Sequence, residues 1–302
     1  MKHLIILNGK AGEGSAAEKN EQIQNAFANL DAEFHFTSAP REATKFVDEY
    51  LKAHDKEQVR VYACGGDGTI NEVANGLVGH ANADLAIYPI GTGNDFIKYY
   101  GGPARFLDLQ KLIEGKSHPI DLSKIESDMV DYPFYSINVT NFGFDSVVGS
   151  YGNKFKLEGK KDPYKKAVNV ALRIGRKNEI VVWADGEQLN EKKMLLCTLA
   201  QGNYVGGEYK CAPRSKNDDG LIDVCLMHTM PLLTLAAIMK PYTAGLHLDT
   251  PKYAKRIEYR QAKEIKIEAP KEIEICVDGE MYPGRKFTVT CIPGAIKLVI
   301  PE

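Results

Sequence analysis

Two glycine-rich segments contain the residues best suited to bind an anionic ligand. Residues 65–72 read Gly-Gly-Asp-Gly-Thr-Ile-Asn-Glu, and residues 91–96 read Gly-Thr-Gly-Asn-Asp-Phe. Glycine lets the backbone turn tightly and approach a ligand closely, and the amides at a helix start favour phosphate oxygens. Thr69 adds a hydroxyl donor, and Asp67 is suited to hold a metal ion that neutralises phosphate charge. Together, the two segments predict a phosphate-binding site.

A third glycine-rich segment, residues 9–15, lies between the first predicted strand and the first predicted helix. From Gly12 its G-x-G-x-x-A spacing loosely fits the dinucleotide-binding motif, and Asp31 or Glu33 lies near the distance of a ribose-binding acid. A plain strand-to-helix turn explains the same residues equally well. The sequence contains no GxxxxGK[ST] motif, so P-loop chemistry is not expected.

Alternating strand and helix patterns predict the sheet that must carry these loops. Short apolar runs predict strands at residues 4–7, 33–36, 59–64 and 85–89. Helical periodicity predicts helices over residues 15–30 and 41–54, the first capped by Ser15 with Glu18 three residues later. This order is typical of a mostly parallel sheet, which binds ligands at the carboxyl ends of its strands. The loops at 65–72 and 91–96 follow two of these strands and are therefore expected at one edge.

The pattern changes after about residue 120 to the two-residue period of half-buried strands. Strands are predicted at 133–140, 180–184, 194–200, 221–227, 264–268, 272–277 and 286–292. Two helices are predicted, at 163–175 and 232–242. We expect a two-domain α/β protein, with a three-layer α/β nucleotide-binding domain over residues 1–125 and an antiparallel β-sandwich over residues 126–293. The last run, residues 294–302, fits either domain and is a candidate completion of the first.

The turn Asp278-Gly279-Glu280 ends a predicted strand of the second domain and presents two carboxylates. An Asp-Gly pair favours a tight turn, which would project both acids into a cleft facing the first domain. A close pair of carboxylates raises one pKa, which improves that group as a base near neutral pH. The same letters at residues 185–187 are predicted to form an exposed hairpin turn instead.

Composition excludes several classes of protein. The 302 residues carry a formal net charge of −2, so no overall basic field indicates nucleic acid. The longest mostly apolar stretch, residues 230–241, is well under the roughly 18 residues of a spanning helix. The six cysteines form no CxxC pair and are typical of buried thiols in a reducing cytoplasm. HExxH and Gly-x-Ser-x-Gly motifs are absent from the sequence, which argues against zinc and serine hydrolases.

The paired motifs at 65–72 and 91–96 resemble the diacylglycerol kinase catalytic family, which includes soluble bacterial lipid kinases and the sphingosine kinases. The resemblance extends over most of the chain, because the order of an α/β domain and a β-rich domain is also similar. The chain departs from the family after Asn8, where Gly9 replaces the usual proline of Asn-Pro-x-x-Gly.

This resemblance implies that ATP binds between the two domains. The nucleotide-binding residues that it implies are Asn8, Thr37, Gly65, Gly66, Asp67, Gly68, Thr69, Asn71, Glu72, Gly91, Thr92, Asn94 and Asp95. The resemblance further implies a structural Mg²⁺ site in the β-rich domain, formed by the Asp219 carboxylate and the Lys216 and Leu221 carbonyls. Solvated acids in an Asp-Gly turn are the alternative for that segment. By the same resemblance Glu280 is the proton acceptor, Asp278 orients it or assists with metal, and Asp67 completes the catalytic set.

The expected activity is transfer of the γ-phosphoryl group of ATP to a lipid hydroxyl, with diacylglycerol converted to phosphatidic acid. Three alternatives stay open: an NAD kinase, a non-catalytic nucleotide or lipid sensor, and a dehydrogenase that uses the segment at residues 9–15. The second loop, residues 91–96, favours the lipid kinase over the NAD kinase.

The expected partner is a lipid substrate at a membrane surface, reached peripherally from the cytoplasm at the inner face. Residues 154–166 contain six lysines and two acids, with Phe155, Leu157 and Tyr164 interleaved and suited to insert at the interface. A solvated charged loop before a helix explains this segment equally well. No nucleic acid is expected, and a homodimer stays open.

Overall fold

The computed structural model describes residues 1–8 and 16–302, and side chains in all of these except residues 16–20. The chain forms two compact units. Unit 1 contains residues 1–122 and 293–302, and unit 2 contains residues 123–292. The boundaries lie within three residues of those expected from the sequence. The final residues 293–302 complete unit 1, because the end of the last strand returns to it.

Unit 1 is built on a parallel sheet whose strands follow the predicted apolar runs. Its first four strands are β1 (Lys2–Asn8), β2 (Ala32–Thr37), β3 (Val59–Gly65) and β4 (Ala83–Pro89). The order is β4-β3-β1-β2, and the end of β16 (Glu280–Ile300) pairs in parallel with β4 through Leu298 and Leu85. Strands β3 and β4 are buried along their whole length, which is expected of a parallel sheet covered on both faces.

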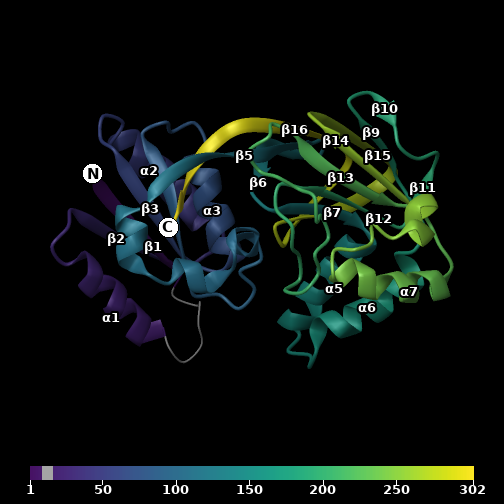
Figure 1. Cartoon of the computed structure of the whole chain (residues 1–302), viewed down its shortest axis with the longest axis horizontal. Helices are drawn as coiled ribbons and strands as arrows, with labels where there is room; N and C mark the ends of the chain where they lie inside the picture. The colour runs from purple at the N-terminus through teal and green to yellow at the C-terminus, as the bar shows by residue number, and fades with distance from the viewer. Residues whose placement is uncertain (9–15) are drawn as a thin grey trace. The chain divides into compact units, whose positions relative to one another are not determined.

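Helices cover both faces of this sheet, which gives three layers (Figure 1). Phe34 contacts Phe27 of α1 (Ala16–Phe27), whereas the next residue, His35, stacks on Phe46 of α2 (Glu42–Ala53). Successive strand residues face opposite sides of a sheet, so α1 and α2 lie on opposite faces. Helix α3 (Asp67–Leu77) packs beside α2, and α4 (Leu109–Glu114) contacts α1. Two 3-10 helices, Phe96–Tyr100 and Pro103–Phe106, lead from β4 to α4.

Unit 2 is an antiparallel β-sandwich with three α-helices and a 3-10 helix, Pro251–Arg256. Its longer strands are β5 (Lys116–Ser127, which begins in unit 1), β6 (Val130–Ser136), β7 (Val139–Gly143), β9 (Val181–Ala184), β12 (Leu196–Ala200), β13 (Ile222–Met227), β14 (Ile257–Ala262), β15 (Glu264–Val277) and the first part of β16. Short strands are β8 (Asn178–Glu179), β10 (Glu187–Gln188) and β11 (Lys193–Met194). The order β14-β13-β12-β7-β15-β16 places β7 beside the strand that ends at Val277.

Two apolar clusters hold unit 2 together. One lies between strands and includes Phe142, Leu199, Val224 and Ile275. The other lies between the sheet and the helices α5 (Phe144–Leu157), α6 (Pro163–Ile174) and α7 (Leu232–Thr243). Figure 1 shows these three helices along one side of the strands. Since the clusters lie on opposite faces of β12 and β7, that sheet is the middle layer of the unit.

Three features of this half differ from the expectations. The strands predicted at 264–268 and 272–277 form one strand, β15, whose pairing with β16 shifts register between Glu268 and Ile273. The strand predicted over residues 133–140 is two strands, because β6 ends at Ser136 and β7 begins at Val139. Helix α5 was not predicted, since glycines at 149 and 152 weaken the helical pattern. Gly152 is buried because the Tyr164 ring of α6 packs where a Cβ would stand, 2.3 Å away. This glycine therefore allows α5 and α6 to approach closely.

The glycine segment at residues 9–15 lies outside the described residues, as does the predicted cap Ser15. The loose match to the dinucleotide-binding motif, which starts at Gly12, therefore lies largely outside the described residues. Within residues 1–8 and 16–302, no helix combines the length and apolar character needed to cross a membrane.

Candidate active site

The carboxyl ends of the unit 1 strands bring four predicted residues to one edge. Asn8 pairs in register with Thr37 across β1 and β2, and Gly65 pairs with Pro89 across β3 and β4. The Asn8 side-chain amide donates to Thr69 Oγ at 3.2 Å, which links β1 to the start of α3. Thr37, found only through the family resemblance, therefore lies beside a residue of the same candidate site.

The two glycine loops are in direct backbone contact. The amides of Ile90 and Gly91 donate to the Gly65 carbonyl at 3.0 and 3.2 Å. A Cβ on Gly91 would stand 2.3 Å from the Cα of Gly66, and a Cβ on Gly65 would stand 2.2 Å from Thr69 Oγ. Both glycines are required because the neighbouring chain occupies the place of a side chain.

Replacing Gly91 with Ala is expected to lower the free energy of unfolding by about 1–3 kcal/mol, the usual cost of overpacking. The clashing atoms belong to the backbone of Gly66, so no side-chain rotation relieves the contact. Calorimetry of Gly91→Ala beside Gly68→Ala checks this, because a Cβ on Gly68 meets no described atom within 4 Å apart from its chain neighbours and its own helix backbone. Equal stability of the two variants would contradict the close approach.

Asp67 connects the two loops through its carboxylate. Its Oδ1 accepts the amides of Asp95 at 2.7 Å and of Phe96 at 3.3 Å. A Cβ on Gly93 would stand 2.7 Å from the other oxygen, Oδ2, so a larger residue there would displace the Asp67 carboxylate. Asp67 also begins α3, where the positive end of the helix dipole stabilises a carboxylate. This residue fixes the geometry of both loops.

Asn94 and Asp95 are buried in the second loop. The Asn94 side-chain amide donates to the Gly91 carbonyl at 2.7 Å, and Asn94 adopts a positive φ of 50°. Its Oδ1 is buried without a hydrogen-bond partner among the described residues. The Asp95 carboxylate accepts from Lys98 Nζ at 2.5 Å. Buried acceptors are rarely left unsatisfied, so Asn94 Oδ1 is suited to receive a donor from a ligand.

The other predicted residues of unit 1 differ in exposure. Thr92 is exposed, Thr69 is buried, and Asn71 accepts from the Asn75 side chain one turn further along α3. Glu72 points its carboxylate at the start of α2, where it accepts the amides of Arg41 and Ala43. The Glu72 carboxylate thus binds backbone amides at the start of α2.

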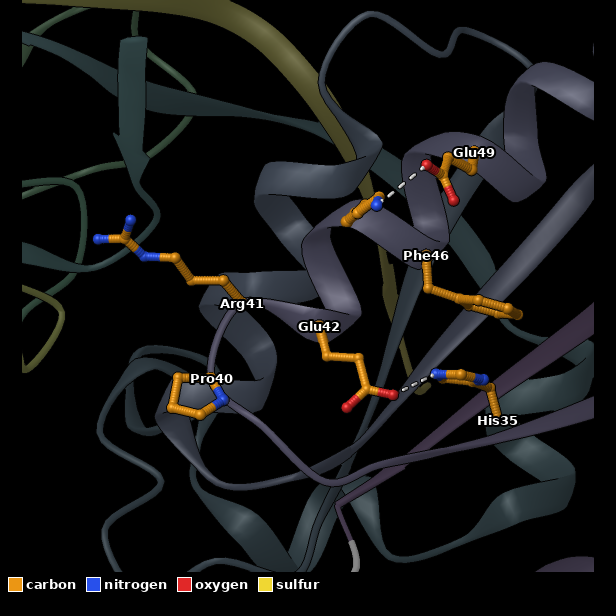
Figure 2. Close-up of a pocket in the computed structure, with 7 residues that line it drawn as sticks. His35, Pro40, Arg41, Glu42, Phe46 and Glu49 are labelled. Carbon is orange, nitrogen blue, oxygen red and sulfur yellow. Dashed lines mark hydrogen bonds and ion pairs between the residues drawn. The ribbon is translucent and has the colours of Figure 1, made fainter. Parts of the chain in front are cut away.

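A hollow of about 390 Å³ lies at the turn from β2 to α2. Its lining residues are His35, Pro40, Arg41, Glu42, Lys45, Phe46 and Glu49. Figure 2 shows the His35 and Phe46 rings parallel, with the Arg41 side chain pointing away from them. Amides of Ser38 and Ala39, with the Ser38 hydroxyl, donate to Glu42 and lower its pKa to about 2. We interpret the hollow as part of a rigid turn after Thr37.

In unit 2, Asp278 organises the turn that precedes Glu280. Its carboxylate accepts the Ser136 hydroxyl at 2.8 Å and the amides of Ile137, Asn138 and Val139 at 2.8–3.2 Å. Its own amide donates to the Val139 carbonyl. Asp278 and Gly279 have φ values of 48° and 97°, as the predicted tight turn requires. Asp278 therefore joins the end of β15 to the start of β7.

Glu280 is exposed at the first position of β16, directly after this turn. Asn153 of α5 donates to the neighbouring Gly279 carbonyl at 3.4 Å and accepts from the Tyr164 hydroxyl at 3.0 Å. Burial, with smaller effects of Cys276 and Glu280, raises the pKa of Tyr164. The Glu280 carboxylate thus stands exposed on a turn that hydrogen bonds of Asp278 and Asn153 hold.

The predicted metal-binding segment forms an oxygen-rich loop before β13. Asp219 accepts the Leu221 amide at 3.1 Å and the Gln261 side chain at 3.3 Å. Asp223 lies close by, and burial together with the charge of Asp219 raises its pKa, against hydrogen bonds from Tyr259, Gln261 and the Lys216 amide. Oxygen donors of this kind fit a hard cation. Among residues 1–8 and 16–302, no three His, Cys, Asp or Glu side chains cluster as metal ligands.

Asp223 is a residue that the sequence did not single out. It lies on a strand predicted from its apolar residues, and its side chain is 1% exposed. The Tyr259 hydroxyl donates to it, and Gln261 bridges it to Asp219. The sequence did hold a signal, because an Asp within a buried strand needs hydrogen-bond partners. Those partners come from β14, more than 30 residues later in the chain.

Two known protein domains match the chain, one over most of unit 1 and one over most of unit 2. Residues 2–125 match the diacylglycerol kinase catalytic domain, and residues 138–300 match the YegS C-terminal NAD kinase beta sandwich-like domain. The chain is 28% identical over 292 residues to the diacylglycerol kinase of Bacillus subtilis, covering 93% of this chain and 91% of that protein. It is 27% identical over 311 residues to a probable lipid kinase, YegS-like, of Pseudomonas aeruginosa, with coverage of 99% and 94%. The crystal structure of a diacylglycerol kinase from Bacillus anthracis superposes with a TM-score of 0.72 at 23% identity, covering 99% of this chain and 96% of that one.

Proposed function

The chain belongs to the lipid kinase family in which a diacylglycerol kinase catalytic domain precedes a YegS-type C-terminal domain, and we propose that it transfers the γ-phosphoryl group of ATP to a lipid hydroxyl. Diacylglycerol is the proposed acceptor, with phosphatidic acid as the product. The diacylglycerol kinase of Bacillus subtilis, similar over 93% of this chain, supports that choice.

The contact between the two glycine loops is the observation that carries this proposal. Asp67 Oδ1 binds two amides of the second loop, and Gly91 lies against Gly66. Phosphoryl transfer depends mainly on positioning and on neutralising charge, and this arrangement provides a rigid edge with a helix start beside it. The buried Asn94 Oδ1 supports a ligand there, because a nucleotide hydroxyl or amino group would satisfy it.

For the acceptor end we propose Glu280 as the group that takes the proton of the lipid hydroxyl. The Asp278 carboxylate, bound to the amides of Ile137 and Val139, fixes the turn on which Glu280 stands. When bound, Mg²⁺ would neutralise phosphate charge beside Asp67. We propose a second, structural Mg²⁺ at the Asp219 carboxylate with the carbonyls of Lys216 and Leu221, in keeping with the oxygen donors of that loop.

A radiolabelled phosphoryl-transfer assay tests the proposed reaction. ATP is supplied with mixed micelles of diacylglycerol, monoacylglycerol, sphingosine, undecaprenol or phosphatidylglycerol, and NAD is tested in parallel. We expect labelled phosphatidic acid as the main product. Label in NAD alone would reassign the chain to NAD phosphorylation, and ATP binding without any labelled product would favour a nucleotide or lipid sensor.

We further propose that the protein acts peripherally on an anionic membrane, from the cytoplasm at its inner face. The α5–α6 segment supports this, because all six lysines between residues 154 and 166 are exposed. Leu157 at the end of α5 is 91% exposed. Phe155 lies under Lys160, and the Tyr164 ring packs on Gly152. Of the three apolar side chains expected to insert, Leu157 is the most exposed, and Tyr164 is about half exposed.

Replacing Lys156 and Lys161 with Gln is expected to weaken binding to vesicles about 30-fold, since each basic residue near an anionic surface contributes about 1 kcal/mol. The measurement is cosedimentation with phosphatidylcholine vesicles that contain phosphatidylglycerol, at low salt. The matched control replaces Lys192 and Lys271, which are exposed outside the segment, and changes the net charge equally. Equal loss in both double variants would contradict a local docking surface.

A further inference from the structure

Glu72 of α3 holds the start of α2. Its Oε1 accepts the Arg41 amide at 2.9 Å, and its Oε2 accepts the Ala43 amide at 3.1 Å. A second link runs the other way, because the Thr44 hydroxyl donates to the Glu72 carbonyl at 2.8 Å. Helix starts carry unpaired amides and a partial positive charge, so a carboxylate is well suited to this place.

The backbone that Glu72 binds is strained. Arg41 is the residue before α2 and has a φ of 65°, in the left-handed region that non-glycine residues rarely adopt. Its own side chain makes no capping hydrogen bond to α2. Strain of this kind persists only where surrounding contacts hold it, and it gathers at functional sites. Here the holding contact comes from α3, the helix that begins at Asp67.

The strained turn follows Thr37 directly. Glu42 binds the amides of Ser38 and Ala39, while Glu72 binds those of Arg41 and Ala43. The two carboxylates together fix the chain from the end of β2 to the first turn of α2. Glu72 differs from Glu42 because it lies on the helix that begins within the first glycine loop. Glu72 therefore links the helix of the first glycine loop to the turn that follows Thr37.

We propose that Glu72 is a positioning residue for the nucleotide, which sets Thr37 relative to the glycine loops by holding the β2–α2 turn against α3. This inference rests on the proposed function, because it takes ATP as the ligand of these loops. In this proposal Glu72 acts on the nucleotide through the β2–α2 turn. Each carboxylate oxygen of Glu72 accepts one backbone amide. A side chain of equal size with a single acceptor oxygen is therefore expected to hold the turn less well.

The test variant is Glu72→Gln. Glutamine keeps one acceptor oxygen, but its NH₂ group would face the amide of Arg41 or Ala43, donor against donor. We expect the Kd of ATP, measured by calorimetric titration, to rise about tenfold, as for the loss of a hydrogen bond to a charged group. The KM for lipid and the kcat at saturating ATP should stay within about twofold, because a positioning defect in ATP binding is overcome by more ATP.

Asp108→Ala is the matched control. Asp108 caps α4 in the same unit, where its side chain accepts the Lys111 amide at 3.2 Å. Both substitutions remove a carboxylate from a helix start, so we expect a similar fall in Tm. Only Glu72→Gln should change the Kd of ATP. If both variants lose stability and neither changes that Kd, Glu72 is a structural cap and the inference is overturned.

Thr44→Val is the second variant, in case Glu72→Gln does not fold. It removes the hydroxyl that donates to the Glu72 carbonyl and leaves the carboxylate in place. We expect a smaller rise in the Kd of ATP, about threefold, in the same direction. An unchanged Kd in Thr44→Val overturns the coupling between α2 and α3. If wild-type protein binds no ATP, the proposed function and this inference both fail, whereas a failure in the variants alone overturns only the inference.

Discussion

Replacing Glu280 with Gln is expected to slow phosphoryl transfer by at least about 100-fold, because a positioned general base contributes roughly 10²–10⁴-fold. Glu280 is exposed at the first residue of β16, and the turn before it is held by Asp278. Glutamine has the same size and should leave that turn intact. The variant should therefore keep the wild-type Tm and the wild-type Kd of ATP.

The control for this experiment is Glu187→Gln. Glu187 follows the other Asp-Gly turn, at the start of β10, and is also exposed. Its partner is Arg260 at 3.6 Å in an exposed ion pair, which contributes little to stability. We expect normal kinase activity in Glu187→Gln. Full activity in Glu280→Gln would remove Glu280 from the role of proton acceptor.

Replacing Asp67 is also expected to lower kinase activity strongly. Two variants separate its hydrogen bonds to the second loop from the effect of its charge on the reaction. Asp67→Asn keeps an oxygen that can accept the amides of Asp95 and Phe96 but removes the charge. Asp67→Ala removes the acceptor oxygen and the charge, and should cost about 1–3 kcal/mol of stability because the amides are left unsatisfied. We expect Asp67→Asn to keep a near-normal Tm and to lose about 10²–10³-fold in kcat/KM, the usual loss for a charge-stabilising group.

Titration of ATP with and without Mg²⁺ in the Asp67 variants identifies which task matters for binding. If the carboxylate acts on Mg-ATP, Asp67→Asn should lose the advantage that Mg²⁺ gives to nucleotide binding. Normal kcat/KM in Asp67→Asn, with a defect in Asp67→Ala alone, would mean that Asp67 serves the loop contact and not the chemistry.

The helical and strand periodicity of the first third predicted the unit 1 sheet closely. The run of residues 59–64 is apolar except for Arg60, and such a run is a local signal of a strand buried on both faces. In contrast, α5 was missed, since Gly152 lowers local helix propensity while the close packing that requires it involves Tyr164, twelve residues later. Tertiary packing outweighs intrinsic propensity in this helix.

The two Asp-Gly-Glu turns have the same local sequence but different partners in the fold. Asp185 and Asp278 both have positive φ, at 47° and 48°, and both accept backbone amides from another segment. Asp185 binds the amides of Lys263 and Glu264, whereas Asp278 binds residues 137–139. The two turns share the sequence Asp-Gly-Glu and the same backbone geometry. Their surroundings differ because different strands meet them.

The glycine loops and the order of the two domains follow from the sequence alone. Tight turns and close backbone approach depend on residue type at a few adjacent positions, and glycine is the residue that permits them. The binding partner of each carboxylate, in contrast, depends on tertiary contacts. Asp67 reaches Asp95, Glu72 reaches Arg41, and Asp278 reaches Val139, over 28, 31 and 139 positions of sequence. Such pairs form when the folded chain brings distant amides within hydrogen-bond distance, and no local pattern encodes that.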